Sequence, residues 1–360
     1  TAAAPPVLTH ESGPAQRIDA ARELRRSVLT LLLWEDTFYE SGSQITQRIA
    51  ALIPQVDPQT VADLAIEARD RFQLRHAPLF LLRELARRPG SGPIVEPALA
   101  HVIQRADELA EFLAIYWSER RQPLAAGVKR GLAAAFMKFD EYALAKYDRA
   151  NRIKLRDVLF LVHAKPRDEA QAALWKRLVD GELATPDTWE VELSAGKDKK
   201  ESFERLLRDG KLGGLAVLRN LRNMQQAGVD ETLIRARLDQ GIARALPFRF
   251  VTAAGHAPHL EDALESAMLK GVAGLPALPG KTGLLVDVSA SMDARLGRKS
   301  ETTRIDAAAG LAILLREKAE HVVIATFSNQ VAVVPPRRGF ALRDADRKST
   351  RLNSSHANIS

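Results

Sequence analysis

The sequence predicts a mostly helical protein that ends in the opening strands of an α/β domain. Helix-type spacing of apolar residues runs almost without interruption from about residue 17 to 270. A stretch rich in glycine and proline follows at 271–283 and is typical of a linker. Continuous apolar runs of the kind found in buried parallel strands begin at residue 284.

The helical part shows its periodicity most clearly at 61–72 and 79–86. In the first segment, apolar side chains recur at helical spacing at Val61, Leu64, Ala65, Ala68 and Phe72. Asp57 and Pro58 fit an N-cap followed by a proline at the first helical position, so we expect a helix to begin there.

Prolines that can end helices recur at a regular distance through this part. They stand at Pro54, Pro89, Pro123 and Pro166, which are 35, 34 and 43 residues apart. Each interval is long enough for two antiparallel helices and a turn. This spacing predicts an α-solenoid of HEAT-like helix pairs over 17–270. A single large helical bundle is the alternative, because the spacing repeats more clearly than the sequence does.

After the linker, the order of elements predicts the first βαβ part of a doubly wound α/β domain at 284–345. Strands are expected at 284–286, 321–327 and 330–334, and a helix at 305–318. The segment 346–360 lacks apolar periodicity and is rich in Ser, Asn and Arg, so we expect a non-native tail, with a genuine disordered tail as the alternative. Residues 1–16 are expected to be disordered or trimmed.

The composition excludes several classes of protein. The 360 residues are 46% hydrophobic and 27% charged, as in ordinary globular proteins, and this length suggests about two domains. The absence of cysteine excludes disulfide scaffolds, thiol catalysis and cysteine-based metal sites. The sequence shows no transmembrane run and no secretory signal, so we expect a cytoplasmic protein without a membrane partner.

Asp287, Ser289 and Ser291 form a D-x-S-x-S pattern directly after the first expected strand. Ligands bind at the carboxyl ends of strands in open α/β sheets, and these oxygen ligands suit a hard cation such as Mg²⁺. The pattern resembles the metal-ion-dependent adhesion site of von Willebrand factor A domains. That family completes the metal sphere with a Thr and an Asp from later loops, which would lie beyond residue 345. We therefore expect Mg²⁺ or another divalent cation to bind this chain weakly or not at all.

Two enzymatic interpretations fit the sequence poorly. Gly280, Lys281 and Thr282 match the end of a P-loop, but Leu275 occupies its first glycine position and a strand follows instead of preceding it. Ser289 lacks the G-x-S-x-G context of a catalytic nucleophile. We therefore expect neither a P-loop NTPase nor a catalytic Ser289.

The net charge of +7 is concentrated in two windows. Residues 129–177 contain twelve Lys and Arg against six Asp and Glu, and residues 195–222 contain eight against four. Such a concentration predicts a surface that binds a polyanion. A solvated face of helical lysines and arginines is the alternative.

Two stretches in these windows carry a family resemblance. The stretch from Lys138, KFDEYALAKYDRANRIKLRDVLFLVHAKP, and residues 188–224, TWEVELSAGKDKKESFERLLRDGKLGGLAVLRNLRNM, resemble the TROVE module of Ro, telomerase-associated and vault proteins. With the D-x-S-x-S domain downstream, the resemblance covers about 17–345 and points to bacterial Ro-like proteins.

The resemblance implies a closed ring of HEAT-like repeats joined to a von Willebrand A domain. It implies binding of noncoding Y-type RNA on the outer surface and of single-stranded ends of misfolded RNA in the ring. It further implies RNA quality control with an exoribonuclease as partner, in a monomer without a catalytic site of its own. The rival interpretation is a helical-repeat scaffold that binds proteins and carries a metal-dependent A domain.

By motif match, the resemblance places Y RNA contacts at Lys146 and His163, while Ala150 replaces a family arginine for which Arg149 can substitute. Arg149, Arg152 and Arg156 stand at a spacing that would put them on one face of a single helix. Aromatic residues are only 6% of the chain, so we expect base stacking to be minor. The full predicted RNA-binding set is Lys138, Lys146, Arg149, Arg152, Arg156, His163, Lys165, Lys197, Lys199 and Lys200.

Overall fold

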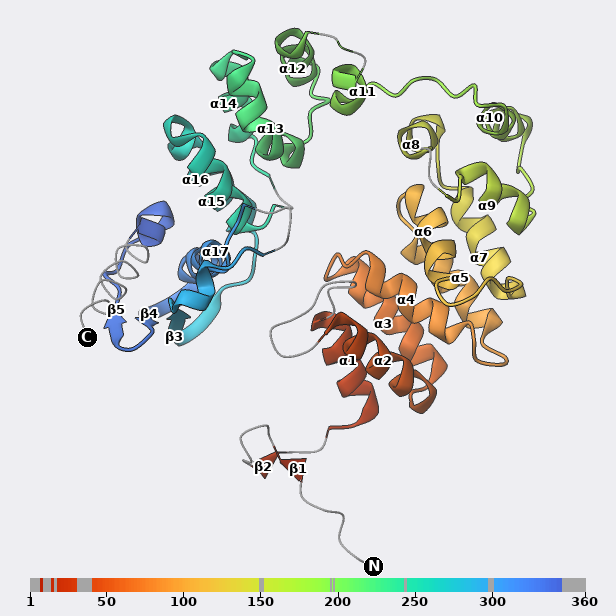
Figure 1. The fold of residues 1–360 in the computed structure, drawn as a ribbon, viewed down its shortest axis with the longest axis horizontal. Coiled ribbons are helices and arrows are strands. Elements are labelled where there is room, and N and C mark those ends of the chain that lie inside the picture. The colour runs from red at the N-terminus through yellow and green to blue at the C-terminus, as the bar shows by residue number, and fades with distance from the viewer. Residues whose placement is uncertain are drawn as a thin grey trace, which may run out of the picture. The chain divides into compact units, whose positions relative to one another are not determined.

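A computed structural model describes residues 7–8, 14–15, 18–30, 41–148, 152–194, 196, 198–242, 245–296 and 301–344. The chain divides into two compact units, which we call unit 1 (Thr1–Pro186) and unit 2 (Asp187–Ser360). Each unit is described by itself (Figure 1).

Unit 1 is helical apart from a pair of two-residue antiparallel strands near its start, β1 (Val7–Leu8) and β2 (Pro14–Ala15). Its helices are α1 (Ala20–Thr30), α2 (Gly42–Leu52), η1 (Ile53–Gln55), α3 (Pro58–Asp70), α4 (His76–Leu85), α5 (Gly92–Val102), α6 (Asp107–Tyr116), α7 (Ala126–Phe136), α8 (Glu141–Tyr147), α9 (Leu155–Val162) and α10 (Glu169–Asp180). As expected, α3 begins after an Asp57 N-cap, whose carboxylate accepts from the Thr60 N–H at 3.0 Å.

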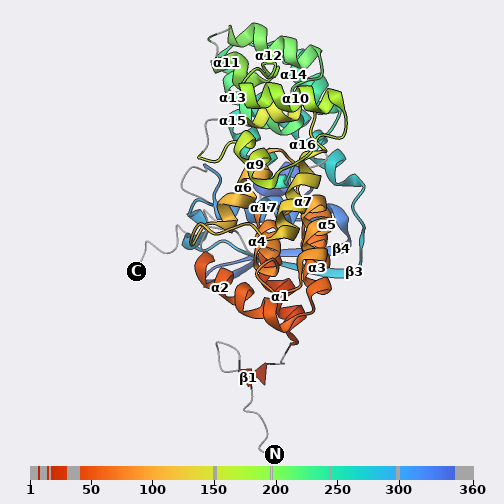
Figure 2. The ribbon, with the colours of Figure 1, turned by 90° about the vertical axis from the view of Figure 1, so that its right-hand side faces the viewer.

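The helices of unit 1 stack in two rows. One row runs through α1, α3, α5, α7 and α9, and the other through α2, α4 and α6 to the other side of α9 (Figures 1 and 2). Glycines allow the close contact of α5 with α7, because a Cβ atom on Gly127 would lie 2.5 Å from the Gly92 carbonyl oxygen. These stacked helix pairs match the solenoid predicted from the proline spacing.

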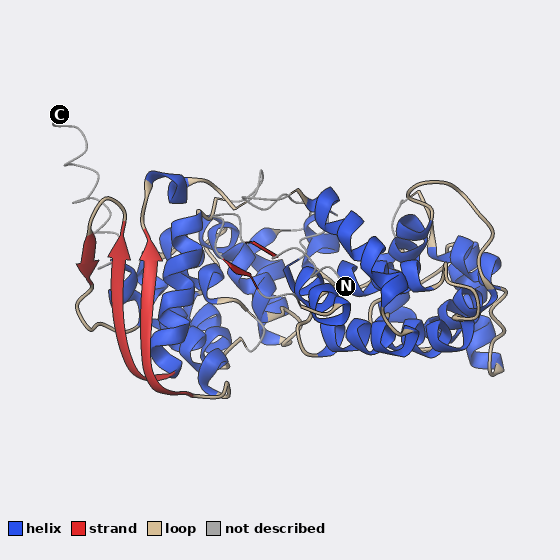
Figure 3. Cartoon of the chain, turned by 90° about the horizontal axis from the view of Figure 1, so that it is seen from below, coloured by secondary structure: helices blue, strands red, loops and turns tan. Residues whose placement is uncertain are grey.

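Unit 2 begins with further helices and ends with a small sheet. Its elements are α11 (Trp189–Ser194), α12 (Lys199–Arg208), α13 (Gly214–Gln226), α14 (Glu231–Asp239), α15 (Pro247–His256), η2 (Pro258–Leu260), α16 (Glu261–Ala273), β3 (Leu278–Asp287), η3 (Ala290–Asp293), α17 (Arg304–Lys318), β4 (Ala319–Phe327) and β5 (Val331–Val333). The strand order is β3-β4-β5, with β3 parallel to β4 and β4 antiparallel to β5 (Figure 3).

The expected order of strand, helix and strand is therefore present, and the mostly helical fold class with an opening βαβ part is confirmed. The linker expected at 271–283 is shorter than predicted, because α16 continues to Ala273 and β3 begins at Leu278. The glycines and prolines there lie largely inside regular structure, which composition alone did not reveal.

The α/β part also does not stand apart from the helices before it. Its buried side chains, among them Val286, Ile313 and Ile324, share one hydrophobic core with residues of α12 to α16. α17 packs closely on α15, since a Cβ atom on Gly310 would lie 2.7 Å from the backbone nitrogen of Phe248. The unit boundary at 186/187 thus falls inside the predicted helical domain 17–270 instead of at its end.

One face of the sheet is covered and the other is apolar but open. Val286 and Ile324 face the core and are buried. Leu285, Val323, Val331 and Val333 on the opposite face are 71%, 61%, 70% and 71% exposed. Apolar residues on both faces are typical of a sheet that helices cover on both sides.

Candidate nucleic-acid interface

Helix α9 presents three chemically distinct side chains on one exposed face. Its opposite face is held in the core by Leu155, Val158, Leu159 and Val162. The open face carries Arg156, Phe160 and His163 at positions i, i+4 and i+7, so a cation, an aromatic ring and an imidazole lie in a row. Phe160 is 59% exposed.

The backbone of His163 ends α9 in a left-handed conformation, with φ 53° and ψ 42°. Its N–H donates to the Phe160 carbonyl oxygen at 3.3 Å. Glycine usually occupies such a position, because the left-handed region costs other residues about 1–2 kcal/mol. His163 is therefore the C-cap of α9, in a backbone conformation that favours glycine.

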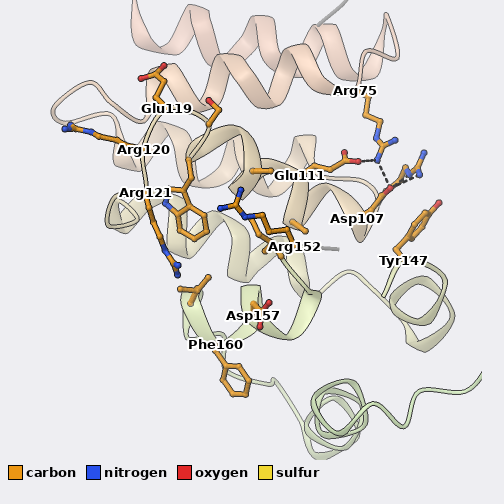
Figure 4. Close-up of a pocket in the computed structure, with 17 residues that line it drawn as sticks. Arg75, Asp107, Glu111, Glu119, Arg120, Arg121, Tyr147, Arg152, Asp157 and Phe160 are labelled. Atoms are coloured by element: carbon orange, nitrogen blue, oxygen red, sulfur yellow. Dashed lines mark hydrogen bonds and ion pairs between the residues drawn. The ribbon is translucent and has the colours of Figure 1, made fainter. Parts of the chain in front are cut away.

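A groove of about 1260 Å³ runs between α6 and α9 (Figure 4). Its polar lining includes Arg75, Arg105, Asp107, Glu111, Glu119, Arg120, Arg121, Arg152 and Asp157, and its aromatic lining is Trp117, Tyr147 and Phe160. In Figure 4, Arg152 lies between the acidic pair Asp107 and Glu111 on one side and Arg121 on the other.

The acidic end of the groove is internally neutralised. Arg75 pairs with both Asp107 and Glu111, and Arg105 donates to Asp107 at 2.9 Å. Burial alone would raise the pKa of Glu111, but the nearby His76 and Arg75 hold it below its usual value. This end therefore offers little net charge to a ligand.

A buried ion pair fixes this end of the groove from behind. Arg69 on α3 donates to the two Glu108 carboxylate oxygens at 2.7 and 2.9 Å, and Glu108 is fully buried. The same carboxylate accepts from the backbone N–H groups of Gln104 and Arg105 at the start of α6. Because removing one partner of such a pair costs roughly 3–5 kcal/mol, the position of α6 is tightly held.

The middle and the other end of the groove carry arginines that are not neutralised. Within the part of the chain that the structure describes, Arg120, Arg121 and Arg152 have no carboxylate partner. The nearby Glu119 is engaged instead by Arg83 and Arg87, at 2.7 and 3.1 Å. The unpaired guanidinium groups are therefore free to bind the oxygens of an anion.

A second pocket of about 540 Å³ adjoins the groove and shares Trp117, Arg121, Phe160 and Leu161 with it. The remaining lining residues are Gln122, Pro123, Leu124, Lys129 and His163. The wall is mostly apolar, whereas the cationic or titratable groups are Arg121, Lys129 and His163. We call this cavity the Trp117 pocket.

Lys146 lies near the end of α8, beside the groove. Its ammonium nitrogen is 5.6 Å from the ring centroid of Tyr142 and 5.8 Å from that of Tyr147. Tyr147 lines the groove and also stacks with Arg105, whose guanidinium carbon is 4.8 Å from the ring centroid. Lys146 thus lies on α8 beside the neutralised end of the groove, and its contact with RNA stays a prediction.

Other residues of the predicted RNA-binding set have different surroundings. The Lys138 ammonium donates to the carbonyl oxygens of Ala100 and Ile103 at the end of α5, and burial lowers its pKa. Lys138 therefore has a structural role at a helix C-terminus. Lys165 is exposed, and Lys199 and Lys200 begin α12 in unit 2. Arg149 and Lys197 lie outside the described residues.

The expected placement of arginines along a single helix is wrong. Arg152 precedes α9, which begins at Leu155, whereas Arg156 lies within it. Asp157 explains the late start, since its carboxylate accepts from the Lys154 N–H at 2.9 Å and caps the helix. The two arginines come from consecutive segments, and only Arg152 lines the groove.

Sequence reasoning missed the segment after α6. Arg120 and Arg121 stand in the run ERRQP before Pro123, and that basic pair beside a proline was the available signal. Trp117 and Phe160 gave no signal, because helical periodicity does not distinguish an exposed aromatic residue from a buried one.

The predicted metal-binding residues lie together in unit 2. At the carboxyl end of β3, the Ser289 N–H donates to the Asp287 carboxylate at 2.8 Å, and the Ser289 and Ser291 hydroxyl oxygens are 3.0 Å apart. Oxygen ligands are of the type that a hard cation prefers, but one carboxylate and two neutral hydroxyls form a weak set. Among the described residues, no group of three or more His, Cys, Asp or Glu could hold a metal.

No described helix is long and apolar enough to cross a membrane.

Comparisons with known proteins support the resemblance found in the sequence. A family model described as the TROVE domain matches residues 173–274, from α10 to the end of α16. The crystal structure of the Deinococcus radiodurans Ro (RSR) protein is similar in fold, with a TM-score of 0.66 and 20% identity. That similarity covers 92% of this chain and 80% of the Ro chain.

The curated relatives are much larger proteins. Telomerase protein component 1 of Mus musculus is 24% identical over 364 residues, and that of Rattus norvegicus is 24% identical over 365 residues. Each match covers 72% of this chain but only 14% of the relative, so the chain spans about one seventh of their length. Together the matches bear out the predicted resemblance to Ro-like TROVE proteins.

Proposed function

We propose that this Ro-like TROVE protein binds RNA through the surface formed by Lys146, Arg152, Arg156, His163 and the groove arginines Arg120 and Arg121, here called the α9 interface. The observation that carries the proposal is the set of groove arginines without carboxylate partners among the described residues. Phosphate groups are the natural partners of such guanidinium groups, and a row of them suits a polymer.

The finer proposal is a ribonucleoprotein component that binds a noncoding Y-type RNA at the α9 interface. Lys146 and His163, which the family motif assigns to such contacts, lie at the two ends of this surface. By the same family resemblance, we propose that single-stranded ends of misfolded RNA enter a ring for quality control with an exoribonuclease. The role is one of binding instead of catalysis.

A double substitution with a matched control tests the proposal. Lys146→Ala with His163→Ala should weaken binding of a structured small RNA by about 1–3 kcal/mol, because two charge-assisted contacts are lost. Lys176→Ala with His101→Ala removes the same residue types from unit 1 at positions already paired with Asp180 and Asp70. This control should bind the RNA like the wild-type protein.

Electrophoretic mobility shifts of both variants against the same RNA provide the measurement. Binding of a plain single-stranded RNA should change less in the interface variant than binding of the structured RNA. If the wild-type protein and the interface variant bound both RNAs with equal affinity, the assignment of RNA binding to the α9 interface would be wrong.

A second candidate function rests on the geometry of the Asp287 loop. The Ser289 and Ser291 hydroxyls lie together after β3, and the Ser289 backbone N–H donates to the Asp287 carboxylate, in the loop where a metal-dependent protein-binding site would lie. In this alternative, the helical repeat binds a partner protein. The loop holds a divalent cation, and an acidic ligand coordinates that cation. Purification at low salt distinguishes RNA binding from protein binding. RNA that co-purifies with the protein and is released at high salt favours the RNA-binding function.

A further inference from the structure

We infer that the Trp117 pocket binds one unpaired nucleobase of the RNA, by stacking on the exposed ring of Phe160. The inference rests on the proposed RNA-binding function and adds a recognition element to it. Phosphate contacts alone would treat paired and unpaired RNA alike, whereas a base pocket distinguishes them.

The pocket has the composition that a nucleobase requires. Its wall is formed by the apolar residues Trp117, Pro123, Leu124, Phe160 and Leu161. Its volume of about 540 Å³ leaves room for a base. An apolar wall of this kind suits an unstacked nucleobase, because every base can pack its flat π-face against it.

The charged groups around the pocket match the phosphate and sugar that accompany a base. Arg121 comes from the segment that joins α6 to α7, Lys129 from the first turn of α7, and His163 from the end of α9. The Arg121 guanidinium carbon lies 5.2 Å from the Trp117 ring centroid, so it can reach a phosphate from above the apolar wall. This charge complementarity favours a nucleotide over an uncharged apolar ligand.

The wall of the pocket is fixed before any ligand arrives. The Trp117 indole N–H donates to the Gln122 carbonyl oxygen at 2.8 Å, and the Tyr116 hydroxyl accepts from the Ala125 N–H at 3.4 Å. These bonds hold the segment after α6 against the helix. A preformed site lowers the entropy cost of binding a mobile base.

Phe160 provides the stacking surface without serving the core. It is 59% exposed and lines both the groove and the Trp117 pocket. Its neighbours Leu159 and Val158 are buried and supply the packing of α9. An exposed phenyl ring between Arg156 and His163 has no evident structural purpose, whereas it is well placed to stack on a base that these cations accompany.

A pair of RNA probes tests the inference. The first is a blunt RNA duplex, and the second is the same duplex with one dangling 2-aminopurine nucleotide. Wild-type protein should bind the second more tightly by roughly fivefold or more, and stacking should quench the fluorescence of the dangling base. Phe160→Ala should remove both the preference and the quenching, while leaving the affinity for the blunt duplex within about twofold.

Phe72→Ala is the matched control, because this ring is 38% exposed and lies at the end of α3 under Arg25 and Arg71. The control should keep the preference and the quenching. Equal affinity of wild-type protein for the two probes, or a preference that survives Phe160→Ala, would overturn the base pocket alone. Failure of wild-type protein to bind either probe would contradict the RNA-binding function and the inference together.

Discussion

The His163 N–H donates to the Phe160 carbonyl oxygen at 3.3 Å, and this short link turns the end of α9 so that imidazole and phenyl ring border the same pocket. The turn depends on a left-handed backbone that favours glycine. A residue that costs stability is therefore found where the proposed function needs a side chain.

We expect His163→Gly to stabilise unit 1 while weakening RNA binding. Glycine relieves the strain of a φ of 53°, and after its own entropy cost the free energy of unfolding should rise by up to about 1 kcal/mol. Thermal unfolding and RNA titration of one preparation measure both effects. Gln73→Gly is the control, because Gln73 has a φ of 56° at the end of α3 and should gain stability without losing affinity. A parallel change in stability and affinity in both variants would contradict this account.

Lys138→Ala should destabilise the fold and leave RNA binding unchanged. Its ammonium satisfies the carbonyl oxygens of Ala100 and Ile103 at the end of α5, and such charged hydrogen bonds contribute about 1.5–3 kcal/mol. Urea unfolding should show this loss, while the affinity for a structured RNA should stay within about twofold of wild type. If Lys138→Ala lowered the affinity for RNA without changing the free energy of unfolding, Lys138 would be an RNA contact instead of a structural residue.

The pH dependence of stability should contain a contribution from Asp187. Hydrogen bonds from Arg205, at 2.5 and 3.1 Å, and from Lys211, at 2.6 Å, hold the pKa of this carboxyl well below its usual range. A depressed pKa stabilises the fold above the unfolded value of about 4, and this stabilisation is lost as the pH falls towards the folded value.

Asp187→Asn should therefore lower the free energy of unfolding at neutral pH, and the difference from wild type should shrink below about pH 4. Urea unfolding across the pH range measures it. If the free energies of unfolding of wild type and Asp187→Asn differed by the same amount at neutral pH and at low pH, the charge of Asp187 would not be the cause of the difference.

Mg²⁺ should not raise the melting temperature of this chain measurably. Asp287, Ser289 and Ser291 lie on one loop, but one carboxylate and two neutral hydroxyls hold a strongly hydrated cation poorly. Differential scanning calorimetry with and without Mg²⁺ tests this. Tight Mg²⁺ binding that Asp287→Ala abolishes would show that another residue completes the site.

Much of the fold could be predicted because its signals are local. The helix at Asp57 and Pro58, the strand before Asp287 and the convergence of Ser289 with that carboxylate each follow from a few neighbouring residues. The shared core of Val286 with α12 to α16 could not be predicted, because it depends on contacts between distant segments. Composition suggested a linker where the structure continues α16 and begins β3.

The candidate interface was predicted in outline and not in detail. Motif matches predict Lys146 and His163 as RNA contacts, but the sequence does not show which lysines and arginines are already paired within the protein. Lys138 bonds to carbonyl oxygens, while the groove arginines have no carboxylate partner among the described residues. The low aromatic content predicts little base stacking, whereas the base pocket that we propose depends on the single exposed ring of Phe160.

The salt dependence of RNA affinity tests the central claim most directly. If Arg152 and Arg156 each neutralise a phosphate, the slope of log affinity against log salt should become less steep by about 1.4–1.8 in the double alanine variant. Lys176→Ala with Arg130→Ala is the control, since both residues are already paired, and its slope should match wild type. Fluorescence anisotropy of a labelled structured RNA across a salt series gives the slopes. An unchanged slope and affinity in the Arg152 and Arg156 variant would contradict the assignment of RNA binding to the α9 interface.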